Sequence, residues 1–372
     1  MKERMRTDAT LYAGIAWSAA GYEAEIVDGD GRAVTPPVRF GAARTDEMIA
    51  YLRGVDRVVA VVDSTNGVLD GRLMAAGLAV RRADPWLLPE RPAFGSVPAG
   101  ALARAACRNP SLLAPLERGR GTQTGREAEL DRWIAASAAD DEALTASGRC
   151  LAHGPRDRRE IALTFDDGPL PPYTGQILDI LERYGVPATF FCVGMNSGPH
   201  AEDLARMREQ GHGLGNHTWS HPFLPELSRP QLAEQIDRTQ EAIALAGGGR
   251  APTLMRPPYG SRTPAVLGWL AELVRTTVLW DVAPDDWAMP GAEAIARSVL
   301  DGARPGSIVL LHDGGGDRAQ TVAALPPIIE GLLARGFRFV LVEDMVPAAG
   351  HADRREQARS GARRALANYG KL

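Results

Sequence analysis

The chain has 372 residues, a formal net charge of −4 and 45% hydrophobic residues, which is ordinary for a soluble globular protein and suggests two domains. We see no apolar run long enough for a membrane helix and no secretory signal, and three widely spaced cysteines do not predict a disulfide framework, so we expect a cytoplasmic protein. The only lysines, Lys2 and Lys371, exclude a P-loop lysine or an interior Schiff-base lysine.

Residues 11–84 contain short apolar runs separated by turn signals, which predict strands with two helices among them. The DGDG run at 28–31 indicates a hairpin between the second and third strands. In chain order, the predicted elements are strands at Leu11–Trp17, Tyr22–Val27 and a third ending near Phe40, a helix at Asp46–Leu52, a strand at Arg57–Val62, a helix at Leu69–Ala76 and a strand at Ala79–Arg82.

This β-β-β-α-β-α-β order resembles the ribonuclease-H-like fold, and the runs YAGIA at 12–16 and VVDST at 61–65 resemble the N-terminal part of DEDD-type transposases. The first carboxylate of such sites follows Gly-Ile, and here that place holds Ala16. Because two-metal nuclease chemistry needs clustered carboxylates, we interpret Asp63 as a strand-end or helix-cap residue. We therefore predict that residues 1–150 form a ribonuclease-H-like, non-catalytic accessory domain with a helical extension, which includes a helix at Gly125–Ala138.

From Arg158 onwards strands alternate with helices, which predicts βα units and a parallel sheet or barrel within a domain at 151–348. The predicted strands are Glu160–Phe165, Ala188–Val193, Gly213–Asn216, Leu254–Arg256, Thr276–Trp280, Ser307–Leu311 and Phe337–Val342. The predicted helices are Tyr173–Tyr184, His200–Gln210, Pro230–Ala246, Pro264–Leu273, Ala292–Ala303 and Thr321–Arg335. A basic tail at 349–372 has six Arg or Lys against two Asp or Glu, a pattern that favours a solvated helix over an acidic partner.

The first motif that carries chemistry is LTFDDGP at 163–169, in which an apolar strand delivers Asp166 and Asp167 and then breaks at Gly-Pro. Catalytic groups of α/β folds gather at such carboxyl ends of strands. Adjacent aspartates can divide the work, one binding a metal and the other handling protons. A simple turn is the structural alternative, because Asp, Gly and Pro are common turn residues.

The second motif is NHTWSHP at 216–222, where His217 and His221 have the i, i+4 spacing that brings two side chains to one face of a helical turn. Zinc proteases use this spacing for paired imidazole ligands. With Asp167, the two imidazoles would give three ligands and leave open positions, as a catalytic metal site requires. The same set can hold non-haem iron, so the ligands alone leave the chemistry open.

Three further motifs follow, each with a plain structural alternative. RPPYG at 256–260 offers a charged fork and a stiff loop that can aim the Tyr259 backbone N–H at an oxyanion, or is only a rigid connection. WDVAPDDW at 280–287 places acidic residues that can orient a histidine, or is a turn with an aromatic anchor. SIVLLHDG at 307–314 ends an apolar strand in His312, a general acid or a buried structural histidine.

The five motifs in this order resemble the polysaccharide deacetylase family, also called carbohydrate esterase family 4 or the NodB homology domain. They appear here as TFDDGP, HTWSH, RPPYG, DVAPDDW and LLH, spread over residues 158–345. The resemblance implies an incomplete (β/α)7 barrel. One departure is Ala283, where an acidic residue often stands two places after Asp281.

The resemblance also implies roles for individual residues. Asp167, His217 and His221 would bind zinc or a similar divalent ion such as Co2+, and Asp166 would be the base that deprotonates the metal-bound water. His312 would protonate the leaving amine. The assisting groups would be the Tyr259 backbone N–H at the oxyanion, Arg256 beside Asp166, and Asp286 beside His312.

We therefore predict a metal-dependent hydrolase that removes an N-acetyl group from an amino sugar or related acetamido compound, with no membrane partner. A cytoplasmic member would act on a soluble sugar conjugate or a biosynthetic intermediate. Three alternatives stay open: hydrolysis of another non-peptide C–N amide bond, an iron oxygenase, and a nucleic-acid-binding module. The net charge of −4 and the scarcity of lysine disfavour nucleic-acid binding, which rests on basic phosphate contacts.

Overall fold

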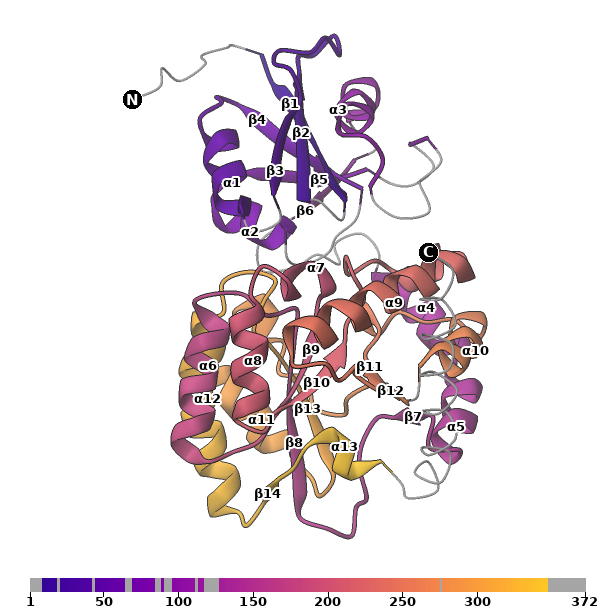
Figure 1. Cartoon of the computed structure of the whole chain (residues 1–372), viewed down its shortest axis with the longest axis vertical. Helices are drawn as coiled ribbons and strands as arrows, with labels where there is room; N and C mark the ends of the chain where they lie inside the picture. Colours follow the sequence, from indigo (N-terminus) through magenta and orange to yellow (C-terminus); the bar gives the residue numbers. More distant parts are fainter. Residues whose placement is uncertain are drawn as a thin grey trace.

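The computed structural model describes residues 9–18, 21–41, 44–63, 69–83, 88–89, 96–110, 113–116, 127–274 and 276–346. These residues build two sheets, a six-stranded one in the N-terminal part and an eight-stranded one in the C-terminal part. Figure 1 shows the two as separate bodies, with the N-terminal sheet lying beyond the α7 end of the larger body. Among the described residues, no helix has both the length and the apolar character needed to cross a membrane.

The N-terminal sheet has the strand order β3-β2-β1-β4-β5-β6. Strands β1 to β3 are antiparallel, β4 and β5 run parallel to β1, and β6 is antiparallel to β5. Its elements are β1 Leu11–Ser18, β2 Gly21–Val27, β3 Val38–Gly41, α1 Thr45–Arg53, β4 Val58–Val62, α2 Leu69–Ala75, β5 Ala79–Arg82, α3 Ala99–Arg108 and β6 Ala114–Leu116. All seven elements predicted over residues 11–84 are present.

Helix α3 lies directly on β1 because Gly14 has no side chain. A Cβ at Gly14 would come within 1.9 Å of the Ala99 carbonyl oxygen, so only glycine allows this approach. On the other face of the sheet from α3, a core is formed by buried aliphatic and aromatic residues of β1, β2, β4 and α1, and it also includes Val193 and Met195 from the C-terminal part. The N-terminal sheet therefore shares one apolar cluster with the larger body.

The C-terminal sheet has the order β13-β8-β9-β10-β11-β12-β7, with β14 beside β8, and its strand pairs are parallel. Its strands are β7 Cys150–Leu151, β8 Glu160–Asp166, β9 Thr189–Cys192, β10 Gly213–Asn216, β11 Leu254–Met255, β12 Thr276–Val278, β13 Ser307–His312 and β14 Arg338–Phe339. An isolated bridge between His153, just after β7, and Ser307 of β13 joins the two ends of the strand order, so the sheet curls. A parallel sheet whose strands alternate with helices along the chain confirms the predicted α/β class.

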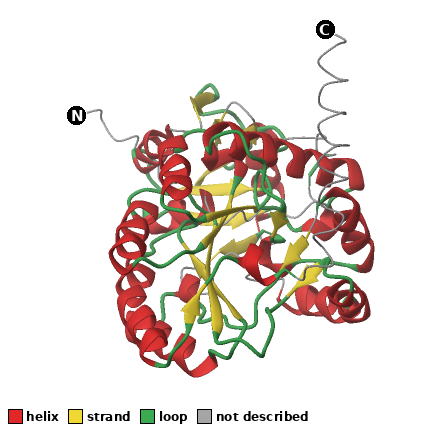
Figure 2. Cartoon of the chain, turned by 60° about the horizontal axis from the view of Figure 1, so that its bottom comes forward, coloured by secondary structure: helices red, strands yellow, loops and turns green. Residues whose placement is uncertain are grey.

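Helices surround this sheet, as Figure 2 shows. They are α4 Glu127–Ala136, α5 Ala138–Ala146, α6 Tyr173–Tyr184, α7 Gly194–Ser197, α8 Ala201–Glu209, α9 Arg229–Ala246, α10 Pro264–Leu273, α11 Ala292–Gly302, α12 Ala319–Ala334 and α13 Val342–Met345. The bounds of α6, β10 and α10 are those predicted. The predicted strand Phe337–Val342 was wrong beyond Phe339, because the Asp344 carboxylate accepts the Leu341 amide and starts α13.

The end of the predicted N-terminal domain, which holds α4 and α5, belongs structurally to the C-terminal body. Strand β7 pairs with β12, α5 packs against β7, and α4 contacts α5. Figure 1 likewise places α5 beside β7. The division at residue 150 stays a prediction, and the predicted basic tail at 349–372 lies outside the described residues.

Candidate metal centre and active site

The motif residues meet at the carboxyl edge of the curled sheet. Asp166 ends β8 and pairs in register with His312, which ends β13. His217 directly follows β10, whose last residue Asn216 pairs with Met255 of β11. Because all these strands run parallel, their carboxyl ends bring the five motifs to one rim, as the alternation of strands and helices predicted.

Asp167, His217 and His221 converge on one point. The Asp167 Oδ1 lies 3.1 Å from the His221 Nε2 and 3.4 Å from the His217 Nε2. The three residues are 5%, 2% and 4% exposed, so bulk water does not screen them. Ligands about 2.0–2.1 Å from one ion lie roughly 3.0–3.4 Å from each other, so these separations suit a single ion.

The loop that carries the two histidines is not the helical turn that the i, i+4 spacing suggested. Thr218 and His221 both have positive φ, 66° and 55°. Side chains hold this shape: the Asn216 Oδ1 accepts the Thr218 amide, and the Thr218 hydroxyl accepts the His221 amide. The Gln235 Oε1 accepts the amides of Trp219 and Ser220. The imidazoles still meet, with ring centroids 4.8 Å apart, because the loop folds back on itself.

The tautomer of His217 is fixed by its surroundings. Its Nδ1 lies 2.8 Å from the Arg256 carbonyl oxygen, which can only accept, so Nδ1 carries the proton. The Nε2 lone pair then faces Asp167. Metal-binding histidines characteristically donate their other ring N–H to a carbonyl or carboxylate in this way.

The electrostatics of the cluster of Asp167, His217 and His221 favour a bound cation. The Asp167 Oδ1 is buried and has no hydrogen-bond partner among the described residues, and the same holds for the His221 Nδ1. Burial raises the pKa of Asp167, but His221 and His217 outweigh it and hold this pKa well below its usual range. Burial lowers the pKa of His221, which favours a neutral imidazole. A carboxylate facing two imidazole nitrogens therefore fits a divalent ion.

Backbone strain is concentrated here. Seven non-glycine residues of the described chain have positive φ, and four of them are Asp167, Thr218, His221 and Tyr259. Each such residue costs on the order of 1–3 kcal/mol and persists only where its surroundings fix it. Two of the three candidate ligands are thus held in conformations that the fold imposes on them.

Asp166 is held beside the centre by Arg256. The Arg256 Nη1 donates to the Asp166 Oδ1 at 2.7 Å and to the Thr164 hydroxyl at 2.8 Å. Arg256 is fully buried, and its guanidinium lies 4.2 Å from the centre of the Phe191 ring. The other carboxylate oxygen, Oδ2, lies 3.6 Å from the His217 Nε2. One oxygen is therefore anchored while the other faces the three candidate metal ligands.

His312 forms a dyad with Asp286. The Asp286 Oδ1 lies 2.7 Å from the His312 Nδ1, and its Oδ2 accepts the His312 amide and the Thr321 hydroxyl. Burial lowers the pKa of His312, but the Asp286 carboxylate outweighs it and raises this pKa above the usual value. The exposed Ala283, the departure from the family pattern, leaves this dyad intact.

Tyr259 lies in a tight turn at Pro258–Gly260 with φ 59° and ψ 8°. The amides of Gly260 and Ser261 donate to the carbonyls of Pro257 and Pro258, which closes the turn. The Tyr259 ring contacts the His221 ring edge-on at 4.5 Å between centroids. The loop thus sits against one of the candidate ligands.

Some supporting residues were not foreseen in the sequence. Three of the four buried residues of α7 connect both ligand loops: Asn196 donates to the Asp167 carbonyl, and the Gly194 and Met195 amides donate to the carbonyls of Thr218 and Trp219. No motif spacing marks α7. Asp313 was not predicted either, although its place directly after His312 in the fifth motif was a signal that could have indicated it. It accepts hydrogen bonds from the Gly168 amide and the Thr174 hydroxyl. Burial raises the pKa of Asp313 to about 7.

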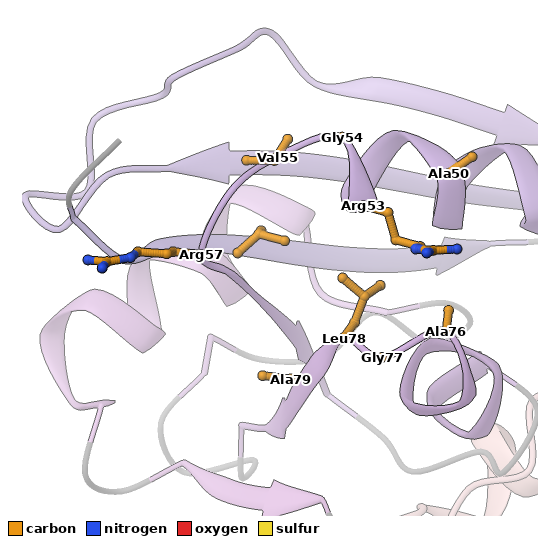
Figure 3. Close-up of a pocket in the computed structure, with 10 residues that line it drawn as sticks. Ala50, Arg53, Gly54, Val55, Arg57, Ala76, Gly77, Leu78 and Ala79 are labelled. Atoms are coloured by element: carbon orange, nitrogen blue, oxygen red, sulfur yellow. The ribbon is translucent and has the colours of Figure 1, made fainter. Parts of the chain in front are cut away.

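A separate pocket of about 900 Å³ lies in the N-terminal sheet, at the ends of α1 and α2 (Figure 3). None of the motif residues lines it, and the Arg57 side chain points away from Leu78 in the figure. Its lining residues are Ala50, Arg53, Gly54, Val55, Arg57, Val58, Ala76, Gly77, Leu78 and Ala79.

Comparison with known proteins agrees with this geometry. A profile of the polysaccharide deacetylase family matches residues 153–278. A peptidoglycan-N-acetylglucosamine deacetylase of Bacillus cereus is 41% identical over 194 residues, which cover 52% of this chain and 90% of that protein. The chain belongs to the polysaccharide deacetylase family. A chitooligosaccharide deacetylase of Rhizobium leguminosarum bv. phaseoli is 43% identical over 199 residues, covering 49% of this chain and 87% of its own length.

Solved structures of the deacetylase family show the same fold. The Bc1960 peptidoglycan N-acetylglucosamine deacetylase, in complex with 4-naphthalen-1-yl-N-oxidanyl-benzamide, superposes with a TM-score of 0.53 at 37% identity, covering 55% of this chain and 95% of its own. A mutant of BA3943, a CE4 family pseudoenzyme with restored enzymatic activity, has a TM-score of 0.50 at 26% identity, covering 53% and 71%. Since this family contains a pseudoenzyme, activity has to be argued from the site residues.

Proposed function

We propose that this chain is a zinc-dependent deacetylase that hydrolyses the N-acetyl group of an amino sugar or a related acetamido compound. The observation that carries the proposal is the placement of a metal-binding triad, an anchored carboxylate and a carboxylate-bound imidazole at one rim of the sheet. Membership of a deacetylase family and the two deacetylase relatives support it.

Asp167, His217 and His221 would hold the ion. A divalent ion bound there supplies two things that amide hydrolysis needs, a lowered pKa for a coordinated water and polarisation of the carbonyl. Zinc suits one carboxylate and two imidazoles, and Co2+ accepts the same set. Three candidate ligands converge there among the described residues, and three protein ligands leave coordination positions open for this chemistry.

Proton transfer falls to two groups of the chain. Asp166 accepts the proton of the attacking water through the oxygen that Arg256 does not hold, and Arg256 keeps that carboxylate oriented. His312 donates a proton to the leaving amine, and Asp286 fixes its Nδ1 tautomer. The Tyr259 backbone N–H donates to the developing oxyanion.

The N-acetylated sugar is proposed because the deacetylase relatives act, by name, on peptidoglycan and chitooligosaccharide. Purified full-length chain, loaded with zinc, should release acetate and a free amine from N-acetylglucosamine oligomers. Release of formate, or opening of a cyclic amide without acetate, would favour the alternative of another non-peptide C–N bond. An oxygenase would need O2, whereas the proposed reaction should run unchanged without it.

We also propose an incomplete (β/α)7 barrel for the C-terminal body and a ribonuclease-H-like, non-catalytic fold for the N-terminal one. The curl of the parallel sheet supports the first. The strand order β3-β2-β1-β4-β5 and the antiparallel start support the second, and Ala16 on β1 supports the absence of nuclease chemistry. Salt-dependent binding of DNA would favour the nucleic-acid module instead. The predicted cytoplasmic location stays a prediction.

A further inference from the structure

The Tyr259 loop is tied to a part of the chain that lies outside the matched family region. Arg262, three residues after Tyr259, donates from Nε to both carboxylate oxygens of Asp141 at 3.0 and 2.9 Å, and from Nη2 to one of them at 2.6 Å. Asp141 belongs to α5, upstream of residues 153–278. The remaining nitrogen, Nη1, donates to the Gly260 carbonyl at 2.6 Å.

This ion pair is sheltered from solvent. The Arg262 side chain is 9% exposed and that of Asp141 is 19% exposed. Arginine presents its N–H groups in a rigid planar fork, so a carboxylate that fills one edge fixes the direction of the other edge. Asp141 thereby aims Nη1 at the backbone of the Tyr259 turn.

The turn needs such support. Tyr259 and Gly260 have consecutive positive φ values of 59° and 63°. A tyrosine seldom adopts this conformation, and it persists only where its surroundings determine it. The bond from Arg262 to the Gly260 carbonyl holds the Gly260–Ser261 peptide, the second peptide after Tyr259. Relaxation of this turn would rotate the Tyr259 N–H away from the reacting carbonyl.

Helix α4 is linked to the same loop through contacts between aromatic rings. Its Trp133 packs against Phe223 with ring centroids 6.3 Å apart. Phe223 stacks on Tyr259 at 4.1 Å, with planes only 8° from parallel. The two helices therefore reach the Tyr259 turn indirectly. Helix α4 does so through Phe223, which stacks on the Tyr259 ring, and α5 through Arg262, which holds the Gly260 carbonyl.

We propose that α4 and α5 are a working part of the active site, in which Asp141 acts through Arg262 as a positioning residue for the Tyr259 N–H. This inference rests on the proposed deacetylase function. It predicts that weakening the pair lowers turnover without changing metal binding, because the three candidate ligands lie on other loops.

The test compares Asp141→Asn and Arg262→Lys with the control Glu142→Gln, an exposed acid next to Asp141 on the same helix. For both test variants of the full chain, kcat should fall about tenfold while KM and zinc affinity stay within about twofold, since small misplacements of an oriented group cost rate. Hydrogen–deuterium exchange of residues 256–263 should become faster. The control should match the wild type in every measurement.

Loss of one partner leaves a buried charge, so Asp141→Asn can fail to fold. The double variant Asp141→Ala/Arg262→Met removes both charges and should show the same drop in kcat and the same faster exchange. Unchanged kcat and exchange in an active variant would overturn the positioning role alone. A wild-type chain that binds zinc but releases no acetate would instead count against the proposed function, and with it the catalytic purpose of the pair.

Discussion

In both sheets of this protein an aspartate stands at the end of a buried central strand, but among the described residues only the C-terminal sheet gathers the motif residues around it. In the C-terminal sheet, Asp166 follows six buried residues of β8 and meets Arg256, His217 and His312 at the same rim. In the N-terminal sheet, Asp63 follows β4 and accepts the Val97 amide at 3.1 Å. The function of an aspartate at the end of a strand depends on the side chains that the other strands place near it. In the N-terminal sheet, the neighbouring strand β1 contributes Ala16, which has no catalytic group.

The largest effect is expected from removing a metal ligand. His217→Ala should abolish acetate release and lower zinc affinity by more than the roughly 100-fold seen when only an outer partner of a metal ligand is lost. Zinc content after dialysis and calorimetric titration measure the affinity. A variant that keeps both full zinc occupancy and full activity would show that the triad is not the centre.

Asp166→Asn should separate chemistry from binding. The amide keeps a carbonyl oxygen for Arg256, so the loop should hold its shape and zinc should still bind. The base is lost, and kcat should fall on the order of 10²–10⁴-fold. Steady-state assays beside a zinc titration test this, and wild-type turnover in this variant would assign the base elsewhere.

Asp286→Asn should move the pH profile. The Asp286 carboxylate raises the pKa of His312, so the imidazole stays protonated to higher pH and activity is lost as pH rises through that raised pKa. Without the negative charge this pKa falls, and the alkaline limb of kcat/KM should shift to lower pH. An unmoved alkaline limb would remove His312 from the role of acid.

Met195→Ala tests whether the N-terminal sheet supports the centre. Met195 lies in α7, its sulfur accepts the Tyr22 hydroxyl of β2 at 3.9 Å, and its amide holds the Trp219 carbonyl between the two histidines. Truncation should cost about 2–5 kcal/mol of stability and weaken zinc binding several-fold.

The control for Met195→Ala is Ile26→Ala, a fully buried residue of the same apolar cluster four places beyond Tyr22 on β2. It should lower stability similarly, measured by thermal unfolding, yet leave zinc affinity unchanged. Equal losses of zinc affinity in both variants would mean that general destabilisation, and not the α7 contact, explains the effect.

The smallest effect is expected from replacing Asp63 in the N-terminal sheet. Asp63→Asn keeps an oxygen for the Val97 amide and changes none of the proposed ligands or proton-transfer groups, so acetate release should equal that of the wild type. Assays of both chains at one zinc concentration are sufficient. A clear loss of activity would mean that the N-terminal sheet does more than support the catalytic body.

Local patterns foresaw most of the elements because burial and period decide them. The fully apolar runs of β8 and β13 indicated buried parallel strands, and the bounds of α6 and α10 followed from their apolar spacing and terminal signals. The end of the last strand was missed, because a single carboxylate, Asp344, captured a backbone amide. Such a capture depends on one side-chain rotamer, which periodicity does not encode.

By itself the sequence determined which groups are candidates for the chemistry and that parallel strands would deliver them to one rim, because strand ends are set by local apolar runs and their breaks. Only the tertiary structure decided how they meet. The HTWSH loop is a strained turn that hydrogen bonds to Gln235 stabilise, and hydrogen bonds from α7 connect the two ligand loops. Asp141 forms an ion pair with Arg262, which lies 121 positions away in the sequence. Contacts between residues so distant in the chain form only when the chain packs, so no local sequence spacing can predict them.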